Sequence, residues 1–216
     1  MERIICLAIG YVFGLFQTGY IYGKMNGIDI RQTGSGNAGT TNVLRTLGKK
    51  AGIITYAGDM LKAVFAALVI RLIFGKSHAD SIMLLSLYSG LGVILGHNYP
   101  FYLGFKGGKG IAASSGVIVS LAYWPLILIN LVTFVSVTAI SRYVSLGSLV
   151  MMTGFFAEFC IFGKLGMIPG LHSEELIEAV IIVLILTVLA FWRHRANIVR
   201  LAQGNERKLW GSKKEN

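Results

Sequence analysis

Long apolar segments constrain this chain more than any other feature of its sequence. A helix needs about 20 mostly apolar residues to cross the hydrocarbon core of a bilayer. Five segments meet this length: 3–23, 51–75, 80–99, 145–163 and 175–192. A further block, 111–140, has no charged residue and is interrupted by Tyr123, Trp124 and Pro125, which favour a turn at a membrane interface. The pattern predicts an all-α integral membrane protein.

The composition excludes a soluble fold. Charged residues make up 14% of the chain and hydrophobic residues 54%, whereas a soluble domain has about 25% charged residues. The net charge of +10 would suit a nucleic-acid-binding protein, but such proteins present Lys and Arg on a soluble scaffold. We therefore expect the lipid bilayer, and no nucleic acid, as a partner of this chain.

Block 111–140 forms either one long span or two short ones, 111–122 and 123–140. The positive-inside rule separates these choices, because cytoplasmic loops are enriched in Lys and Arg. With two spans and an outside N-terminus, fifteen of the twenty Lys and Arg residues are cytoplasmic, four are outside and Lys62 lies within a span. One long span leaves eight inside and eleven outside. The sequence thus predicts a seven-transmembrane-helix bundle, a single domain over residues 1–216, with the N-terminus outside, the C-terminus cytoplasmic and cytoplasmic glycine-rich loops.

The first polar stretch, residues 33–48, has the composition of an anion-binding loop. Its glycines allow positive φ and close approach of the backbone, so that consecutive N–H groups can surround an anion. Arg45 can bind a phosphate through two parallel hydrogen bonds. The alternative is a flexible connecting loop, which does not require this concentration of polar groups. The candidate site residues are Ser35, Gly36, Asn37, Gly39, Asn42 and Arg45, and Thr40 and Thr41 add further hydroxyl groups.

The second stretch, residues 96–110, ends immediately before an apolar segment predicted to be a helix. Glycine N–H groups and a helix N-terminus together favour phosphate binding. The stretch is not a Walker A loop, because Leu103 and Gly110 replace residues that this motif needs. Lysines that anchor a helix end to lipid headgroups would explain the charge but not the glycines. The candidate phosphate-binding residues are His97, Lys106, Gly107, Gly108, Lys109 and Gly110.

The third stretch runs from Trp192 to Lys208 and is predicted to continue a helix out of the membrane. In a helix, His194 and Asn197 share one face at the spacing i, i+3. Gly204 is expected to end this helix, and Glu206 to pair with a nearby Arg. A lone His near a membrane surface is more often passive than catalytic.

Two further polar features lie within or beside the apolar segments. Asp59 and Lys62, three residues apart in one span, can neutralise each other, either as a structural pair or as support for a site. Ser145 lies at the inner end of another span, where its hydroxyl can face the polar loops, and it is a further candidate substrate-binding residue. Glu158 and Glu178 are assigned no role.

Taken in order, the three stretches resemble the motifs of the bacterial acyl-phosphate:glycerol-3-phosphate acyltransferases, the PlsY type. The matching segments are GSGNAGTTNVLRTLG at 34–48, GHNYPFYLGFKGGKG at 96–110 and LAFWRHRANIVRLAQGNERK at 189–208. They cover about 50 of the 216 residues, in the order of the family, and no polar position departs from its pattern.

The resemblance implies a multi-pass enzyme of the bacterial inner membrane with its active site facing the cytoplasm. Such an enzyme transfers a fatty acyl group from acyl phosphate to the sn-1 hydroxyl of glycerol 3-phosphate. The products are lysophosphatidic acid and inorganic phosphate, in the first step of bacterial phospholipid synthesis. The resemblance implies catalytic roles for Ser35, Arg45, His194 and Asn197, and phosphate binding by Lys106 to Gly110. No metal or cofactor is expected, and the enzyme that makes acyl phosphate is a further expected partner.

Two questions remain open at this level. Either His194 or the phosphate of the acyl donor can accept the proton of the attacking hydroxyl, with Asn197 or backbone N–H groups stabilising the oxyanion. From another class, a membrane transporter or channel for a phosphorylated anion would also use cationic loops, but it should show inverted repeats or midplane charges in several spans. A non-catalytic lipid-binding scaffold would leave the glycine-rich loops unexplained.

Overall fold

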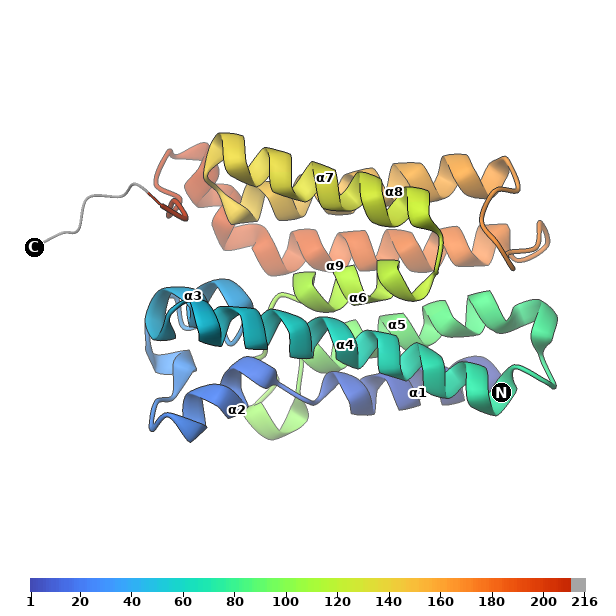
Figure 1. Cartoon of the computed structure of the whole chain (residues 1–216), viewed down its shortest axis with the longest axis horizontal. Helices are drawn as coiled ribbons and strands as arrows, with labels where there is room; N and C mark the ends of the chain where they lie inside the picture. The colour runs from blue at the N-terminus through green and yellow to red at the C-terminus, as the bar shows by residue number, and fades with distance from the viewer. Residues whose placement is uncertain (211–216) are drawn as a thin grey trace, which may run out of the picture.

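The computed structural model describes residues 1–210, and over this range the chain forms α-helices, three short 3₁₀ helices and no strand (Figure 1). The α-helices are α1 (Glu2–Gly14), α2 (Thr18–Met25), α3 (Thr40–Leu47), α4 (Lys49–Phe74), α5 (Ile82–Asn98), α6 (Ile111–Ser120), α7 (Trp124–Ser141), α8 (Val144–Lys164) and α9 (Leu176–Ala202). The 3₁₀ helices are η1 (Ile30–Gln32), η2 (Ala79–Ser81) and η3 (Phe101–Leu103). The all-α prediction is confirmed for these residues.

Six helical segments are long and apolar enough to cross a membrane: Glu2–Met25, Lys49–Phe74, Ala79–Leu103, Trp124–Ser141, Val144–Lys164 and Leu176–Ala202. They correspond to six of the predicted spans. The seventh, 111–122, forms only the ten-residue helix α6. At 1.5 Å per residue α6 is about 15 Å long, which is shorter than the hydrocarbon core.

The first predicted span, 3–23, is not one continuous helix. Helix α1 ends at Gly14 and α2 begins at Thr18, so the predicted span is present as two consecutive helical pieces within Glu2–Met25. The break is compensated by tertiary contacts, because the buried Gln17 amide donates to the carbonyls of Gly14 and Gly96. Hydropathy averaged over the segment does not reveal this break, because Gln17 is the one polar residue among the three that form it.

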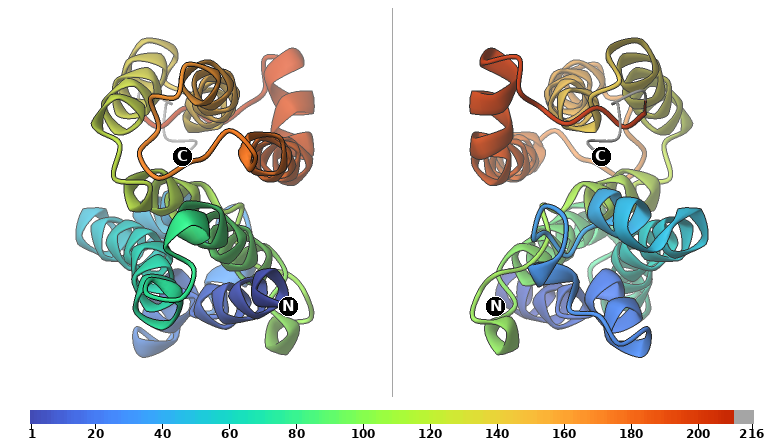
Figure 2. Two further views of the ribbon diagram at one scale, coloured as in Figure 1. Left: turned by 90° about the vertical axis from the view of Figure 1, so that its right-hand side faces the viewer. Right: turned by 90° about the vertical axis from the view of Figure 1, so that its left-hand side faces the viewer.

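Two groups of helices are visible when the molecule is viewed from its ends (Figure 2). Helices α1, α4 and α5 pack together in one group, and α7, α8 and α9 in the other. Helix α6 lies between them against α4, and α5 contacts α9. The largest cluster of buried apolar side chains includes residues of α4, α5, α6, α8 and α9, so the two groups share one core. The helices run along the long axis, with the N-terminus and the end of α9 toward opposite ends (Figure 1).

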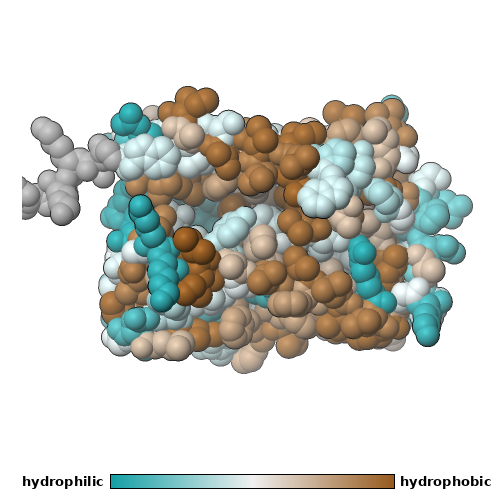
Figure 3. Space-filling model, in the orientation of Figure 1, coloured by the Kyte–Doolittle hydropathy of each residue, from teal (hydrophilic) through white to brown (hydrophobic). Residues whose placement is uncertain are grey.

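The outer surface agrees with a membrane location. On the face shown in Figure 3, apolar side chains form a broad band along the middle, and hydrophilic side chains gather mainly toward the two ends. The exposed apolar residues include Leu72, Val132 and Ile140, which are 84%, 61% and 85% exposed. Large apolar surfaces of this kind are stable in contact with lipid and unfavourable in water.

Helices α1 and α5 approach each other unusually closely. Gly10 and Gly14 of α1 face Gly92 and Gly96 of α5, and a Cβ at any of the four would overlap a backbone atom of the other helix. Both helices therefore contain the G-x-x-x-G spacing that lets membrane helices pack backbone to backbone. This contact fixes the end of α5, from which the second glycine-rich stretch emerges.

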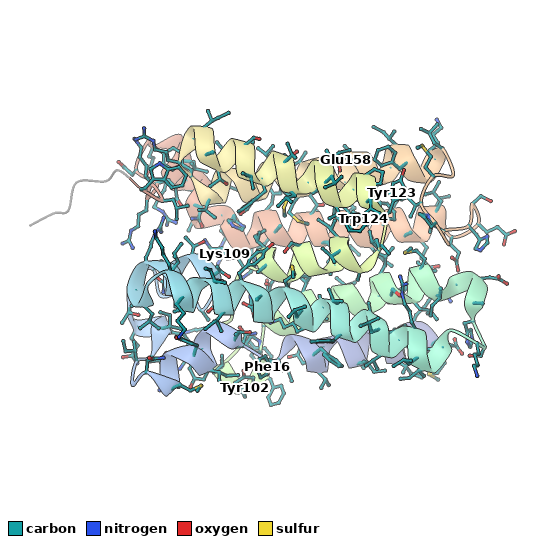
Figure 4. The ribbon with its side chains drawn as sticks, in the orientation of Figure 1. Phe16, Tyr102, Lys109, Tyr123, Trp124 and Glu158 are labelled. Atoms are coloured by element: carbon teal, nitrogen blue, oxygen red, sulfur yellow. The ribbon has the colours of Figure 1, made fainter. Side chains whose placement is uncertain are left out.

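The aromatic turn in block 111–140 is present as predicted. Helix α6 ends at Ser120 and α7 begins at Trp124, with Pro125 in the first turn of α7. Proline is favoured there because the first turn of a helix needs no N–H donor. In Figure 4, Tyr123 and Trp124 lie well away from Lys109 along the long axis. The block therefore folds as two helices.

Candidate active site

A cavity of about 810 Å³ lies where the two helix groups meet the polar loops. It is lined by residues of the loop before α3, of α3 and α4, of the loop before α6, and of α7, α8 and α9. Of the fifteen residues predicted for the site, all except Gly108 line it. They are Ser35, Gly36, Asn37, Gly39, Asn42, Arg45, His97, Lys106, Gly107, Lys109, Gly110, Ser145, His194 and Asn197. The fold thus brings together three stretches that are far apart in the sequence.

Asn42 fixes the shape of the first stretch. Its side chain is buried, and its Oδ1 accepts a 2.8 Å hydrogen bond from the backbone N–H of Ser35. Its Nδ2 donates to the carbonyls of Ile30 and Thr33, both at 3.0 Å. Gly34 directly precedes Ser35 with φ of +61°, a conformation that favours glycine. Asn42 therefore holds the loop from inside, and its predicted role as a direct phosphate ligand stays a prediction.

A second asparagine shapes the same stretch closer to α3. The backbone N–H of Gly39 donates to Oδ1 of Asn37 at 2.9 Å, which closes a short turn before the helix. Helix α3 then begins at Thr40. This arrangement places Arg45 one helical turn or more into α3, on the cavity.

The second stretch is built differently from the predicted phosphate cradle. The N–H of Gly107 donates to the carbonyl of Asn98 at 3.2 Å, and the N–H of Gly108 donates to the carbonyl of His97 at 3.1 Å. These two donors are therefore engaged with the end of α5, and the prediction that they point at a phosphate was wrong. A Cβ on Gly108 would overlap the imidazole of His97. The glycine is needed for close packing.

Arg193 of α9 connects the second stretch to the third. Its guanidinium donates to the carbonyls of Gly107 and Gly108 at 2.9 Å, and it lies 5.2 Å from the centre of the Tyr99 ring. Both the polar contacts and the cation–π contact hold the glycine loop against α9. Arg193 is therefore engaged with the loop backbone, and the loop itself contributes Lys106 and Lys109 to the cavity.

Helix α9 continues through the third stretch, as predicted, and presents His194 and Asn197 to the cavity. Their exposed fractions are 3% and 6%. His194 Nδ1 lies 2.8 Å from the carbonyl of Ala190. A carbonyl only accepts, so Nδ1 bears the hydrogen and Nε2 of the neutral ring has a free lone pair. The helix ends at Ala202 and Gly204 has φ of +72°, as expected for a helix terminator.

Glu206 is the centre of a polar network at one wall of the cavity. Its carboxylate accepts hydrogen bonds from Ser145 at 3.0 Å, from Asn197 at 2.7 Å and from Arg200 at 2.7 Å. Burial alone would raise the pKa of Glu206, but these three donors together lower it below its ordinary value. The predicted pairing of Glu206 with an Arg is confirmed. The sequence did not indicate that it would also hold Ser145 and Asn197.

Lys109 is the central cation of the site. Its Nζ donates to Oδ1 of Asn197 at 2.5 Å, so Asn197 joins Lys109 to Glu206. Burial lowers the pKa of Lys109 to about 8, and the nearby Arg200 and Arg193 act in the same direction, against Glu206. A buried cation among other cations binds an anion well, because the anion offsets both the desolvation and the repulsion.

Arg45 connects α3 to the C-terminal segment. Its guanidinium donates to the carbonyls of Arg207 and Lys208 at 3.0 and 3.2 Å. The same segment is held by a 2.8 Å hydrogen bond from the N–H of Leu209 to the carbonyl of Arg142. Burial lowers the pKa of Arg45 from its ordinary value, and the guanidinium remains charged at neutral pH. Arg45 therefore lies beside the cavity with only neutral oxygens as partners in this network.

Part of the cavity wall is apolar and was not identified from the sequence. Its side chains come from α3, α6, α7 and α8, and they include Leu44, Ile111, Phe134 and Val144. Tyr56 also lines the cavity, with its hydroxyl 3.1 Å from that of Ser115. Apart from Leu44, which lies in the first polar stretch, these residues are in apolar segments without a distinguishing motif, so only the packing of α4 and α6 near α7 and α8 reveals them.

The intramembrane pair of Asp59 and Lys62 is confirmed, with Lys62 Nζ 3.0 Å from Asp59 Oδ1. Asp59 and His97 line the cavity, and both are almost fully buried. Glu178 forms an ion pair with Arg3 and accepts from Tyr88, while Glu158 accepts from Asn130. In residues 1–210 no three His, Cys, Asp or Glu residues lie close enough to hold a metal ion. The expectation that the site needs no metal or cofactor stays a prediction.

Comparison with known proteins identifies relatives over the full length of the chain. Residues 4–204 match the family described as glycerol-3-phosphate acyltransferase. A glycerol-3-phosphate acyltransferase of Clostridioides difficile is 45% identical over 98% of this chain and 97% of its own length. One of Alkaliphilus metalliredigens is 40% identical, with 97% of each chain covered.

Solved structures show the same fold. A crystal structure of PlsY, an integral membrane glycerol 3-phosphate acyltransferase, in its glycerol 3-phosphate form, superimposes with a TM-score of 0.80. It is 31% identical and covers 98% of this chain and 96% of its own. The lysophosphatidic acid form of PlsY superimposes with a TM-score of 0.78 at the same identity, covering 96% of this chain and 95% of its own.

Proposed function

The chain belongs to the glycerol-3-phosphate acyltransferase family, and from this premise we propose that it transfers a fatty acyl group from an acyl phosphate to the sn-1 hydroxyl of glycerol 3-phosphate. The observation that supports this most is that all three polar stretches line one cavity. Both substrates contain a phosphate, which accounts for two cation-bearing loops on the same site. Family membership also sets aside the alternative of a transporter or channel.

The proposed reaction is a direct attack. The sn-1 oxygen of glycerol 3-phosphate forms a bond to the acyl carbon, and the bond from that carbon to the phosphate oxygen of the donor breaks. The hydroxyl proton leaves, and the products are lysophosphatidic acid and inorganic phosphate. An acyl phosphate is a mixed anhydride with a good leaving group, so no covalent enzyme intermediate is required.

The cations of the cavity are placed to bind and orient the two phosphates. Lys109, with its lowered pKa, and Arg45, with two neutral carbonyl partners, are the side chains we assign to phosphate binding. Ser35 lies on the same cavity in the loop held by Asn42. Holding both substrates in one orientation removes much of the entropic barrier of a two-substrate reaction.

His194 is the candidate group for accepting or orienting the proton. Its Nδ1–H is donated to Ala190, which leaves Nε2 as the acceptor in a buried part of the cavity. The leaving phosphate of the donor is the alternative acceptor. If His194 is the base, both H194A and H194Q should lower the turnover number about 100-fold or more. If the donor phosphate takes the proton instead, both variants should retain most of the wild-type turnover.

The apolar part of the wall is suited to the acyl chain of the donor. Ile111 lies on α6, between the two helix groups, and Phe134 lies on α7, and both line the cavity beside the polar groups. We infer that the acyl chain lies along this wall while its phosphate faces Lys109. The enzyme that makes acyl phosphate is a proposed partner, because a reactive acyl phosphate is best delivered directly.

We further propose the orientation in the membrane: one domain with seven passes, the N-terminus outside and the cavity open to the cytoplasm of a bacterial cell. The proposal counts α6 as a short pass and rests on the excess of Lys and Arg at one end; Lys213 and Lys214 of that count lie outside the described residues. With Cys6 and Cys160 replaced by Ala, a cysteine at Asn205 should resist a membrane-impermeant maleimide added to intact cells, and one at Ser77 should react. The reverse result would invert the orientation.

The donor assignment has its own test. Purified protein in detergent should release phosphate from palmitoyl phosphate only when glycerol 3-phosphate is added, with lysophosphatidic acid formed in equal amount. Palmitoyl-coenzyme A and palmitoyl-acyl carrier protein, which contain the same acyl chain, serve as alternative donors for comparison. If either of them supports the reaction and palmitoyl phosphate does not, the proposed donor is wrong.

A further inference from the structure

Lys62 lies buried in the middle of α4, and the proposed reaction gives it no role. An ammonium group has three N–H donors and no acceptor. Lys62 Nζ lies 2.7 Å from the carbonyl of Phe16, 3.0 Å from Oδ1 of Asp59 and 2.7 Å from Nδ1 of His97. All three hydrogens therefore have partners, and Lys62 is not available to a substrate phosphate.

The first of these contacts closes the break between α1 and α2. Non-helical backbone within a membrane segment needs hydrogen-bond partners from the protein, because lipid offers none. Lys62 reaches the carbonyls of Phe16 and, at 3.4 Å, Gly14, while the hydroxyl of Tyr102 donates to the carbonyl of Leu15 at 2.7 Å. Figure 4 shows Phe16 and Tyr102 close together at the edge of the bundle.

The second contact neutralises Asp59. This carboxylate is 1% exposed, lines the cavity and also accepts from the hydroxyl of Thr18 at 3.2 Å. Without Lys62 it would present an unpaired negative charge to a cavity that binds two phosphates. Removing one partner of a buried ion pair strongly destabilises a protein, because the other charge is left unpaired. A test of Lys62 must therefore distinguish the loss of its charge beside Asp59 from the loss of its contact with His97.

The third contact reaches the second glycine-rich stretch through His97. Because Lys62 can only donate, Nδ1 of His97 accepts and its hydrogen lies on Nε2. The ring of His97 packs so tightly on Gly108 that a Cβ there would overlap it, and the His97 carbonyl accepts from the N–H of Gly108. The next residue is Lys109, whose ammonium faces the cavity.

We propose that Lys62 is a positioning residue for the active site: it fixes the ring of His97 and, through the contact of His97 with Gly108, the backbone that places Lys109. One buried cation thus joins the break in the first membrane segment to the phosphate-binding loop. The kinetic test of this inference rests on the proposed function, and its exchange test does not.

The test compares K62M, the charge-neutral double variant D59N/K62M and a control, R71M. Arg71 is a basic residue of the same helix that donates to the carbonyl of Ser120 at 2.9 Å, at a distance from the site. K62M and D59N/K62M should both raise KM for at least one phosphorylated substrate by about tenfold or more, since small displacements of binding groups have effects of this size. R71M should leave KM unchanged.

In the double variant no unpaired charge remains at residue 59, so any change in KM reports the lost contact of Lys62 with His97. The same variant replaces K62M in the test if K62M does not fold. If D59N/K62M has the KM of the wild type, Lys62 acts only by neutralising Asp59 and the inference is overturned. If the wild type shows no turnover with palmitoyl phosphate, the proposed function fails, and the second measurement decides the inference.

That measurement is hydrogen exchange of the backbone by mass spectrometry. In D59N/K62M, exchange should accelerate in the segment 104–110, which contains the N–H groups of Gly107 and Gly108, as well as around residues 14–18. A role limited to the break between α1 and α2 predicts faster exchange around 14–18 alone. That outcome, or unchanged exchange in both segments, contradicts the inference.

Discussion

The two glycine-rich stretches are similar in composition and are built on different principles. In the first, Gly34 and Gly36 have φ of +61° and +71°, and Asn42 ties the loop together from inside. In the second, Gly107 and Gly108 have ordinary φ values and are needed because His97 and the end of α5 leave no room for a side chain. Gly34 and Gly36 are therefore needed for their conformation, and Gly107 and Gly108 for space, although Gly104 and Gly110 of the second stretch also have positive φ, of +64° and +86°.

The difference extends to their cations. The first stretch supplies Arg45, which remains charged at any physiological pH. The second supplies Lys109, whose pKa is lowered to about 8 by burial and neighbouring cations. Under the proposed function, phosphate binding by Arg45 should be insensitive to pH and phosphate binding by Lys109 should be sensitive. Variants can test both this difference and the different roles of the glycines.

The largest expected effect comes from G108A. The new Cβ would overlap the His97 ring, so the ring or the loop must move, and kcat/KM should fall about 100-fold or more, mainly through KM. The comparison variant in the first stretch is G39A, where φ is −87° and the new Cβ would meet only Oδ1 of Asn37, at 2.8 Å, so its kcat/KM should fall less than that of G108A. Steady-state kinetics and thermal midpoints should be measured for both. If G108A has the kinetics of the wild type, Gly108 is not required for close packing against His97.

A smaller effect is expected from N42A, which removes the internal support of the first stretch. Two carbonyls and the Ser35 N–H lose their partner, and the free energy of unfolding should fall by about 1–3 kcal/mol with a rise in KM. The control is N130A on α7, where the amide contacts Glu158 and Leu126 away from the cavity. It should lower the thermal midpoint without changing KM. A rise in KM of equal size in both variants would show that the loop has no special dependence on Asn42.

The smallest effect is the pH dependence of substrate binding. As the pH rises through about 8, Lys109 loses its proton and its attraction for a phosphate. The KM of the substrate whose phosphate binds Lys109 should therefore rise about tenfold between pH 7 and 9. The phosphates of both substrates remain dianionic over this range. K109R should flatten this dependence, because Arg stays charged. A steep profile that persists in K109R would assign the titration to another group.

Much of this molecule was predictable because its strongest signals are local. Apolar length indicated the helical membrane segments, and Tyr123, Trp124 and Pro125 indicated the turn between α6 and α7. Helix periodicity placed His194 and Asn197 on one face, and both line the cavity. The G-x-x-x-G spacings of α1 and α5 are a further local signal, and they indicate close helix packing.

The sequence by itself determined the family, the all-α membrane fold and fourteen residues that line the cavity, because motifs and hydropathy depend on residues close in the chain. Tertiary structure alone decided how those residues act. The bond of Gln17 to Gly96 beside the break and the bond of Ser145 to Glu206 join helices that are distant in the sequence, and the N–H groups of Gly107 and Gly108 are engaged because the loop folds back on the end of α5. A donor that is free in a local motif becomes occupied once packing supplies an acceptor, and only the folded chain shows which acceptors lie within reach.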